Sequence, residues 1–340
     1  MFHPRNFALR RWLQGNKRFV SKESSDVCRQ ALLFPGQGSQ FVGMCGRFIK
    51  ETWLQTLFSR AHKIIGFDLL KLCLEGPIEE LQKTENCQLA VVMASLAGLE
   101  WYRYHGDSSM SSVCATAGFS VGEFAALVFA KAISLEDALR VIRIRAKAMQ
   151  IASEKHPSGM VTVKGLQDKA IQDLCQAAKT LAHSQDPHQA SVAMVANFLY
   201  PKGHVIAGTM DVIEYILQYG KIKHGAKDVK QLPVSGAFHT SLMASAQSIL
   251  KDTLNATAIF IPQIPVYSNV TGKPFSSVEE IKMLLVEQVV QPVQWQTLLQ
   301  NMIADQKPSM FYEVGPGRQL NTMLYRIDSK YKRHCKNISV

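Results

Sequence analysis

The amino-acid sequence predicts an α/β protein in which a parallel-sheet core carries a small inserted βαββαβ subdomain. Short apolar runs alternate with helical stretches along most of the chain, and this alternation is typical of a parallel sheet. Between residues 159 and 234 the order changes to strand, helix, two strands, helix and strand, which is that of a split ferredoxin-like unit. With 340 residues, of which 47% are hydrophobic, the chain can bury a core large enough for both parts.

Four short apolar runs supply the predicted core strands. They cover residues 31–34, 113–117, 264–267 and 310–314, and each is followed by a loop that contains glycine. Helices are predicted over 121–130 and from Ser134, which opens a capping-box-like start, to about Gln150. Because ligands bind outside the carboxyl ends of parallel strands, the loops after these runs should meet at one edge and bring Gln37 close to Ser120.

The inserted subdomain sets the predicted domain boundaries. Its elements are predicted over 160–163, 168–181, 191–198, 204–208, 211–218 and 229–234. The ferredoxin-like subdomain then spans 158–234, and the discontinuous core spans 29–157 and 235–330. Residues 331–340 are predicted to form a basic tail.

The net charge of +11 is concentrated at the two ends of the chain. Since the middle is nearly neutral, we expect no nucleic-acid partner. The first 22 residues hold six basic residues and no acid, and this composition predicts a mitochondrial import segment over 1–28. A frayed basic tail is the alternative to an import segment. The longest uncharged span, 253–272, contains two prolines, so we expect no membrane-spanning helix.

The seven cysteines are scattered and never stand in C-x-x-C spacing. This pattern argues against a disulfide framework and against a zinc site, and it fits a reducing compartment. We therefore expect no metal ion.

The strongest chemical signal is Gly118-Phe119-Ser120-Val121-Gly122, a G-x-S-x-G pattern at the end of a predicted strand. In this pattern a serine sits on a tight strand-to-helix turn that only flanking glycines allow, and its hydroxyl is exposed. A serine hydroxyl needs a base within hydrogen-bond reach to become a nucleophile. Ser120 is thus a candidate nucleophile that requires a partner.

His239 is the candidate base among the ten histidines. It lies in Ser235-Gly236-Ala237-Phe238-His239-Thr240, where small residues bring the backbone close to a site before a new helix begins. A lone histidine is more often a surface group or a hydrogen-bonded core group. The sequence context alone therefore allows either a catalytic base or a structural histidine at this position.

Seven motifs together resemble those of the malonyl-coenzyme A:acyl carrier protein transacylases, in their mitochondrial form. They are FPGQGSQ (34–40), GFSVGE (118–123), IRAKAMQ (144–150), SGAFHT (235–240), SNVTG (268–272), PVQW (292–295) and EVGPG (313–317). The resemblance spans about residues 31 to 320. A G-x-S-x-G pattern alone would be weak, whereas seven motifs in order are specific.

The resemblance implies an α/β-hydrolase-like core with a ferredoxin-like insertion, and it implies roles for single residues. Ser120 would carry the acyl group and His239 would be its base. A backbone carbonyl near the PVQW motif, mapped to Gln294, would orient the histidine. Gln37 and the N–H of Val121 would form the oxyanion hole.

The resemblance also implies how the acyl group is selected. Arg145 would grip the free carboxylate of a malonyl group, which a guanidinium fork can bind in bidentate fashion. Asn197 would help to position the acyl group at a cleft between the domains. Glu123 matches a motif position without an assigned role, and Phe119 replaces a histidine that many relatives carry.

The implied reaction is a two-step transfer of malonyl from malonyl-coenzyme A to the phosphopantetheine thiol of acyl carrier protein, in the mitochondrial matrix. No cofactor is implied beyond these substrates, and we expect a monomer. Because acyl carrier proteins are acidic, Arg140 or Lys147 could contribute to a basic rim. The rival functions are a serine thioesterase or acyl hydrolase and a non-catalytic homologue that binds acyl carrier protein.

Overall fold

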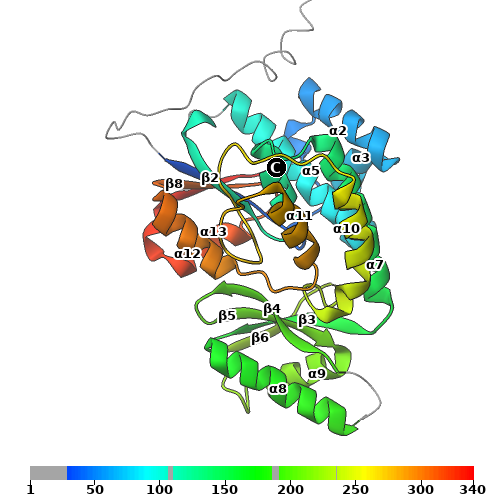
Figure 1. Cartoon of the computed structure of the whole chain (residues 1–340), viewed down its shortest axis with the longest axis vertical. Coiled ribbons are helices and arrows are strands. Elements are labelled where there is room, and N and C mark those ends of the chain that lie inside the picture. Colours follow the sequence, from blue (N-terminus) through cyan, green and yellow to red (C-terminus); the bar gives the residue numbers. More distant parts are fainter. Residues whose placement is uncertain (1–28, 106–109, 186–190, 235) are drawn as a thin grey trace, which may run out of the picture.

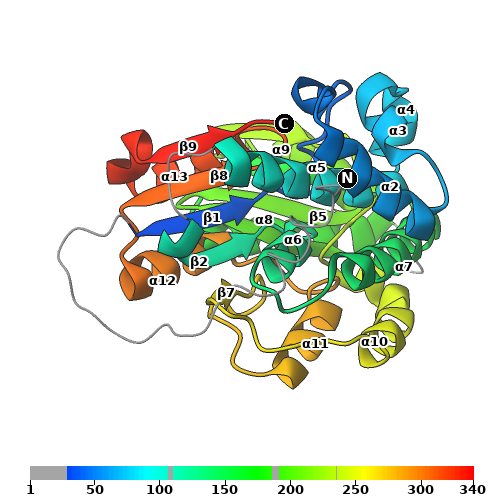
Figure 2. The ribbon, with the colours of Figure 1, turned by 90° about the horizontal axis from the view of Figure 1, so that it is seen from above.

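The computed structural model describes residues 29–105, 110–185, 191–234 and 236–340, so the predicted import segment lies outside the described part. Two sheets organise these residues (Figure 1). A five-stranded parallel sheet has the order β7-β2-β1-β8-β9, which Figure 2 shows strand by strand. A four-stranded antiparallel sheet has the order β4-β5-β3-β6. The predicted α/β class with an inserted subdomain is confirmed.

The core sheet contains the four predicted strands and one that was not predicted. Its strands are β1 (Gln30–Phe34), β2 (Val113–Gly118), β7 (Val266–Tyr267), β8 (Met310–Val314) and β9 (Cys335–Ile338). The expectation of a basic tail over 331–340 is wrong, because β9 pairs in parallel with β8 and buries Ile338 and Val340. The lysines and arginines there suggested a solvated end, but the edge of β8 offers backbone partners to this segment.

Helices cover both faces of the core sheet because neighbouring residues of each strand point to opposite sides. Leu32 and Phe34 pack into one cluster with α5 and α6, whereas Ala31 and Leu33 pack into another with α12 and α13. The helices of the core are α2 (Thr52–Ile65), α3 (Leu69–Glu75), α4 (Ile78–Gln82), α5 (Thr84–His105), α6 (Gly122–Phe129), α7 (Leu135–Glu154), α10 (Gln247–Asn255), α11 (Val278–Glu287), α12 (Trp295–Gln306) and α13 (Gln319–Ile327). Short 3-10 turns lie at Gly46–Phe48, Met110–Ser112, Ser241–Ala246 and Ser329–Arg333.

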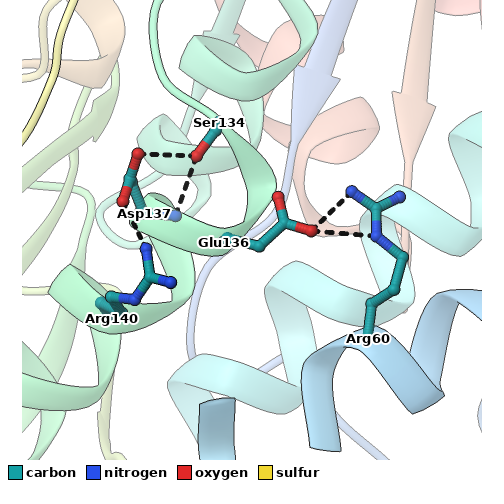
Figure 3. Close-up of polar contacts among 5 residues, drawn as sticks. All are labelled: Arg60, Ser134, Glu136, Asp137 and Arg140. Atoms are coloured by element: carbon teal, nitrogen blue, oxygen red, sulfur yellow. Dashed lines mark hydrogen bonds and ion pairs between the residues drawn. The ribbon is translucent and has the colours of Figure 1, made fainter. Parts of the chain in front are cut away.

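Helix α7 begins with the predicted cap (Figure 3). The Ser134 Oγ atom accepts a hydrogen bond from the Asp137 N–H at 3.0 Å, which satisfies one of the free amides of the first turn. Arg140 then pairs with Asp137 at 2.5 Å, and the Arg60 guanidinium of α2 binds Glu136 at 2.7 Å. These contacts fix the helix that carries Arg145.

The inserted subdomain consists of one sheet and two helices, in the predicted βαββαβ order. Its elements are β3 (Ser158–Lys164), α8 (Asp168–Gln185), β4 (Ala193–Tyr200), β5 (Gly203–Thr209), α9 (Met210–Tyr219) and β6 (Asp228–Gln231). Val161, Val163 and Ile206 pack against α8 and α9 on one face. Met160 and Val205, from the opposite face, join the main core, so the sheet lies between its helices and the rest of the molecule (Figure 1).

Backbone hydrogen bonds join the two parts directly. The Val293 N–H donates to the Ala196 carbonyl at 2.8 Å, and the Phe198 N–H donates to the Val293 carbonyl at 2.9 Å. Strand β4 is therefore clamped to the segment that precedes α12. Within the described residues, no helix is both long enough and apolar enough to cross a membrane.

Candidate active site

Ser120 lies on a strained turn between β2 and α6, as the G-x-S-x-G pattern predicts. Its backbone φ is 51°, in the left-handed region that side-chain-bearing residues rarely adopt. A Cβ atom at Gly118 would lie 1.9 Å from the Gly122 carbonyl, and one at Gly122 would lie 2.4 Å from the Phe34 carbonyl oxygen. Both glycines are thus required by close backbone approach, and the turn is held against the end of β1.

The two predicted catalytic residues meet. The Ser120 Oγ atom lies 2.9 Å from the His239 Nε2 atom. The His239 Nδ1 atom lies 2.7 Å from a backbone carbonyl oxygen, which can only accept, so Nδ1 carries the ring proton. The Nε2 atom is then free to accept the hydroxyl proton of Ser120. A serine and a histidine in this relation can generate an alkoxide nucleophile.

The carbonyl that orients His239 belongs to Gln288, not to Gln294 as expected. Gln288 follows the last residue of α11, where carbonyl groups lack intrahelical partners and can accept from a side chain. Gln294 lies at the N-terminal cap of α12, and its N–H donates to the Asn269 carbonyl at 2.7 Å. The prediction for Gln294 is therefore wrong, although a backbone carbonyl does replace the third acid.

Burial and a neighbouring cation keep His239 neutral. Desolvation and the charge of Arg145 lower the pKa of His239 to about 4. A neutral imidazole is the form that accepts a proton, so the base is ready near neutral pH.

Arg145 is fully buried beside the nucleophile. Its Nη1 atom donates to the Gln88 Oε1 atom at 2.5 Å, and its Nη2 atom donates to the Gln288 Oε1 atom at 2.7 Å. The same Nη2 atom lies 3.3 Å from the Ser120 Oγ atom. Burial lowers the pKa of Arg145 to about 10, which leaves the guanidinium charged at neutral pH. Its Nε atom has no partner among the described residues.

The predicted oxyanion residues lie on loops that abut. The Phe119 N–H donates to the Phe34 carbonyl at 2.8 Å, and a Cβ atom at Gly36 would lie 2.4 Å from the Phe119 carbonyl oxygen. The Gln37 side chain donates to the Thr84 Oγ1 atom at 3.3 Å. The N–H of Val121, just before α6, has no acceptor in the described part of the chain. The oxyanion roles of both residues stay predictions.

Asn197 lies on β4, at the junction of the two sheets. It is buried, and its Nδ2 atom has no partner within the described residues. The acyl-positioning role of Asn197 stays a prediction.

Phe119, which precedes the nucleophile, packs edge-on against Trp295, with ring centroids 5.3 Å apart.

Four polar residues of the site have no role that was predicted from the sequence. Asn269 accepts the Ser120 N–H on its Oδ1 atom at 2.6 Å and donates from Nδ2 to the Gly118 carbonyl at 2.7 Å, so it brackets the turn. Glu123 accepts from the Asn269 N–H at 2.9 Å. Asn269 lies in the SNVTG motif and Glu123 in the GFSVGE motif. Gln88 lies within α5 and Gln288 directly after α11, and no sequence signal marks either residue.

An activated serine on a strand-to-helix turn, with a buried cation at its side, defines a serine-dependent acyl-transfer site. A family model described as the acyl transferase domain matches residues 31–332. The chain belongs to this acyl transferase family.

Relatives and solved structures agree with the family. The chain is 39% identical over 314 residues to the mitochondrial malonyl-CoA-acyl carrier protein transacylase of Mus musculus, covering 92% of this chain and 82% of the relative. It matches the crystal structure of malonyl-CoA:acyl carrier protein transacylase from Xanthomonas oryzae with a TM-score of 0.83 and 30% identity, over 93% and 96% of the two chains. A structure of a type II PKS acyl-carrier protein in complex with its malonyl-transacylase also matches. The TM-score is 0.81 and the identity 32%, over 92% of this chain and 96% of the matched chain.

Proposed function

We propose that this acyltransferase moves a malonyl group from malonyl-coenzyme A to the phosphopantetheine thiol of acyl carrier protein, through an ester on Ser120. The observation that carries the proposal is the position of Arg145. Its Nη2 atom lies 3.3 Å from the nucleophilic oxygen. In a malonyl thioester a single methylene separates the carboxylate from the reacting carbonyl, so a cation for that carboxylate must lie this close to the serine.

In the first half-reaction, the Ser120 Oγ atom attacks the thioester carbonyl while the His239 Nε2 atom takes the hydroxyl proton. The carbon–sulfur bond then breaks, and His239 returns the proton to the departing coenzyme A sulfur. In the second half-reaction, His239 takes the proton of the carrier thiol, whose sulfur attacks the ester. The bond to Ser120 breaks, and His239 returns the proton to the serine oxygen.

Backbone N–H groups at the turn would stabilise the oxyanion of each tetrahedral intermediate. Val121 supports this role because its N–H is uncommitted in the described part of the chain. Loss of one such donor typically costs about 2.7 to 4 kcal/mol of transition-state stabilisation. For Gln37, release of its side chain from Thr84 or use of its backbone N–H would supply the second donor.

The names of the relatives support a partner and a compartment for this chain. The printed name of the mouse relative includes acyl carrier protein and the word mitochondrial. We propose that the present chain acts on acyl carrier protein in the mitochondrial matrix, and that it is a monomer. Of the two suggested rim residues, Arg140 already pairs with Asp137 (Figure 3), so Lys147 is the freer candidate for an acidic carrier.

Incubation with malonyl- and acetyl-coenzyme A, followed by peptide mass mapping, tests the proposal. We expect a malonyl label on Ser120 that acyl carrier protein removes as malonyl-carrier. Release of free malonate to water at the same rate without carrier would instead indicate the thioesterase. A chain that takes no label would indicate the non-catalytic carrier-binding homologue.

A further inference from the structure

Glu123 is a buried carboxyl group that the proposed reaction steps do not use. It belongs to the first turn of α6, three residues after the nucleophile, and its side chain is fully enclosed. One carboxylate oxygen accepts from the Asn269 N–H at 2.9 Å, and the other accepts from the Gln288 side-chain amide. Burial raises the pKa of Glu123, whereas these hydrogen bonds and the charge of Arg145 lower it. Because both of its oxygens face N–H donors, the geometry fits the ionised carboxylate.

The Gln288 side chain links this carboxyl group to Arg145. Its Oε1 atom accepts from the Arg145 guanidinium at 2.7 Å, while its Nε2 atom donates to Glu123 and, at 3.2 Å, to the Ser120 carbonyl. A guanidinium can only donate and a carboxylate can only accept. The two charged groups therefore fix which end of the amide faces which side.

This arrangement holds the cation without neutralising it. A carboxylate in direct contact with Arg145 would compete with the carboxylate of an acyl group for the same donors. The acid is instead kept one amide away, and the groups that touch the guanidinium are the neutral oxygens of Gln88, Gln288 and Ser120. The guanidinium thus remains available to an incoming anion.

We propose that Glu123 is a positioning residue which, through the Gln288 amide, aims Arg145 at the carboxylate of the acyl group and so sets the preference for malonyl over acetyl. This inference rests on the proposed function. The base is held independently of this link, since His239 is oriented by the backbone carbonyl of Gln288 rather than by the Gln288 side chain.

The substitution Glu123→Gln tests the proposal with little change in shape. Its oxygen can still accept from Asn269, but its NH2 group then faces the NH2 group of Gln288. Relief of that conflict requires the Gln288 amide to turn, which presents a donor to Arg145. We expect the ratio of kcat/KM for malonyl-coenzyme A to that for acetyl-coenzyme A to fall about tenfold or more, with acetyl transfer to Ser120 changed only slightly.

Glu313→Gln is the matched control. Glu313 is also a fully buried acid, with a pKa raised to about 7 by burial, but its oxygens accept from the backbone N–H groups of Leu320 and Asn321. A merely structural effect of removing a buried charge would lower both acyl activities together in both variants. Equal losses of malonyl and acetyl transfer in Glu123→Gln would overturn the proposal.

Two further measurements keep the proposal open to refutation. In an Arg145→Ala background, Glu123→Gln should have no further effect on the malonyl to acetyl ratio, because Glu123 acts through Arg145. Gln288→Leu keeps the carbonyl that holds His239 and should reproduce the loss of preference if Glu123→Gln does not fold. A full further effect in the Arg145→Ala background, or an unchanged preference in Gln288→Leu, would contradict the proposal.

A readout without substrate separates the failure of this inference from failure of the proposed function. The side-chain NMR signal of Arg145 should shift or broaden in Glu123→Gln and stay unchanged in Glu313→Gln. If the unmodified protein takes no malonyl group, the proposed function fails, and the NMR comparison still decides whether Glu123 positions Arg145. An unchanged Arg145 signal in Glu123→Gln overturns the positioning role itself.

Discussion

The Ser120 Oγ atom lies 2.9 Å from the His239 Nε2 atom, although 119 residues and a whole inserted subdomain separate them in the chain. The serine is presented by a turn at the end of β2. The histidine, also at a positive φ of 62°, is held by the carbonyl of Gln288. Two residues with strained backbone dihedral angles thus face each other through their side chains. Strain of this kind persists where the surrounding structure enforces it.

Arg145→Ala should change the acyl group that the protein accepts. Loss of a hydrogen-bonded cation costs about 1.5 to 3 kcal/mol, so malonyl transfer should fall roughly 10- to 150-fold, whereas acetyl transfer should be retained or increased. Rates of coenzyme A release with both thioesters measure this. Arg143→Ala, on the exposed side of the same helix, is the control and should leave both rates unchanged. Equal loss of both activities in Arg145→Ala would exclude a carboxylate-binding role.

The acylation step should keep its rate to unusually low pH. His239 has a pKa of about 4 rather than 6.5, and a base acts only in its neutral form, which predominates above its pKa. The rate should therefore stay constant as pH falls from 7 to about 5 and decline only near the lowered pKa. Single-turnover release of coenzyme A, with circular dichroism at each pH as a check on folding, measures it. An inflection near 6.5 would mean that the imidazole is solvated.

Gly122→Ala should destabilise the turn that presents the nucleophile. The added Cβ atom would lie 2.4 Å from the Phe34 carbonyl oxygen, a backbone atom that cannot easily move. Overpacking of this kind costs about 1 to 3 kcal/mol of unfolding free energy. Urea denaturation measures the loss. Gly46→Ala is the control, since its Cβ atom would meet its nearest neighbour, Leu74, at an ordinary 3.8 Å; similar stabilities for the two variants would count against the packing argument.

The last strand should contribute to stability although it lies in a basic segment. Ile338 of β9 is buried against the core, and replacement of a buried isoleucine by alanine typically costs about 2 to 5 kcal/mol. Lys336→Ala, on an exposed position of the same strand, should change little. Thermal and urea unfolding compare the two variants. A stability of Ile338→Ala equal to that of Lys336→Ala would show that β9 is not part of the cooperative core.

The sequence by itself determined the elements and the chemistry that is local to them. The G-x-S-x-G turn at Ser120 and the βαββαβ order of the insertion could be predicted from the sequence. Both depend on backbone geometry within a few neighbouring residues, which glycine spacing and residue periodicity reflect. The sequence context also singled out His239 as a candidate base. The resemblance gave it that role and added Arg145, and the structure brings both residues to the serine.

The tertiary structure alone decided which polar groups serve those residues. That Gln288 rather than Gln294 holds His239, and that Glu123 connects to Arg145, depends on where α11 ends relative to α6 and α7. The place of β9 was likewise decided by the open edge of β8. Hydrogen bonds between distant segments leave no periodic trace in the chain, because their partners are chosen by packing in three dimensions rather than by spacing in sequence.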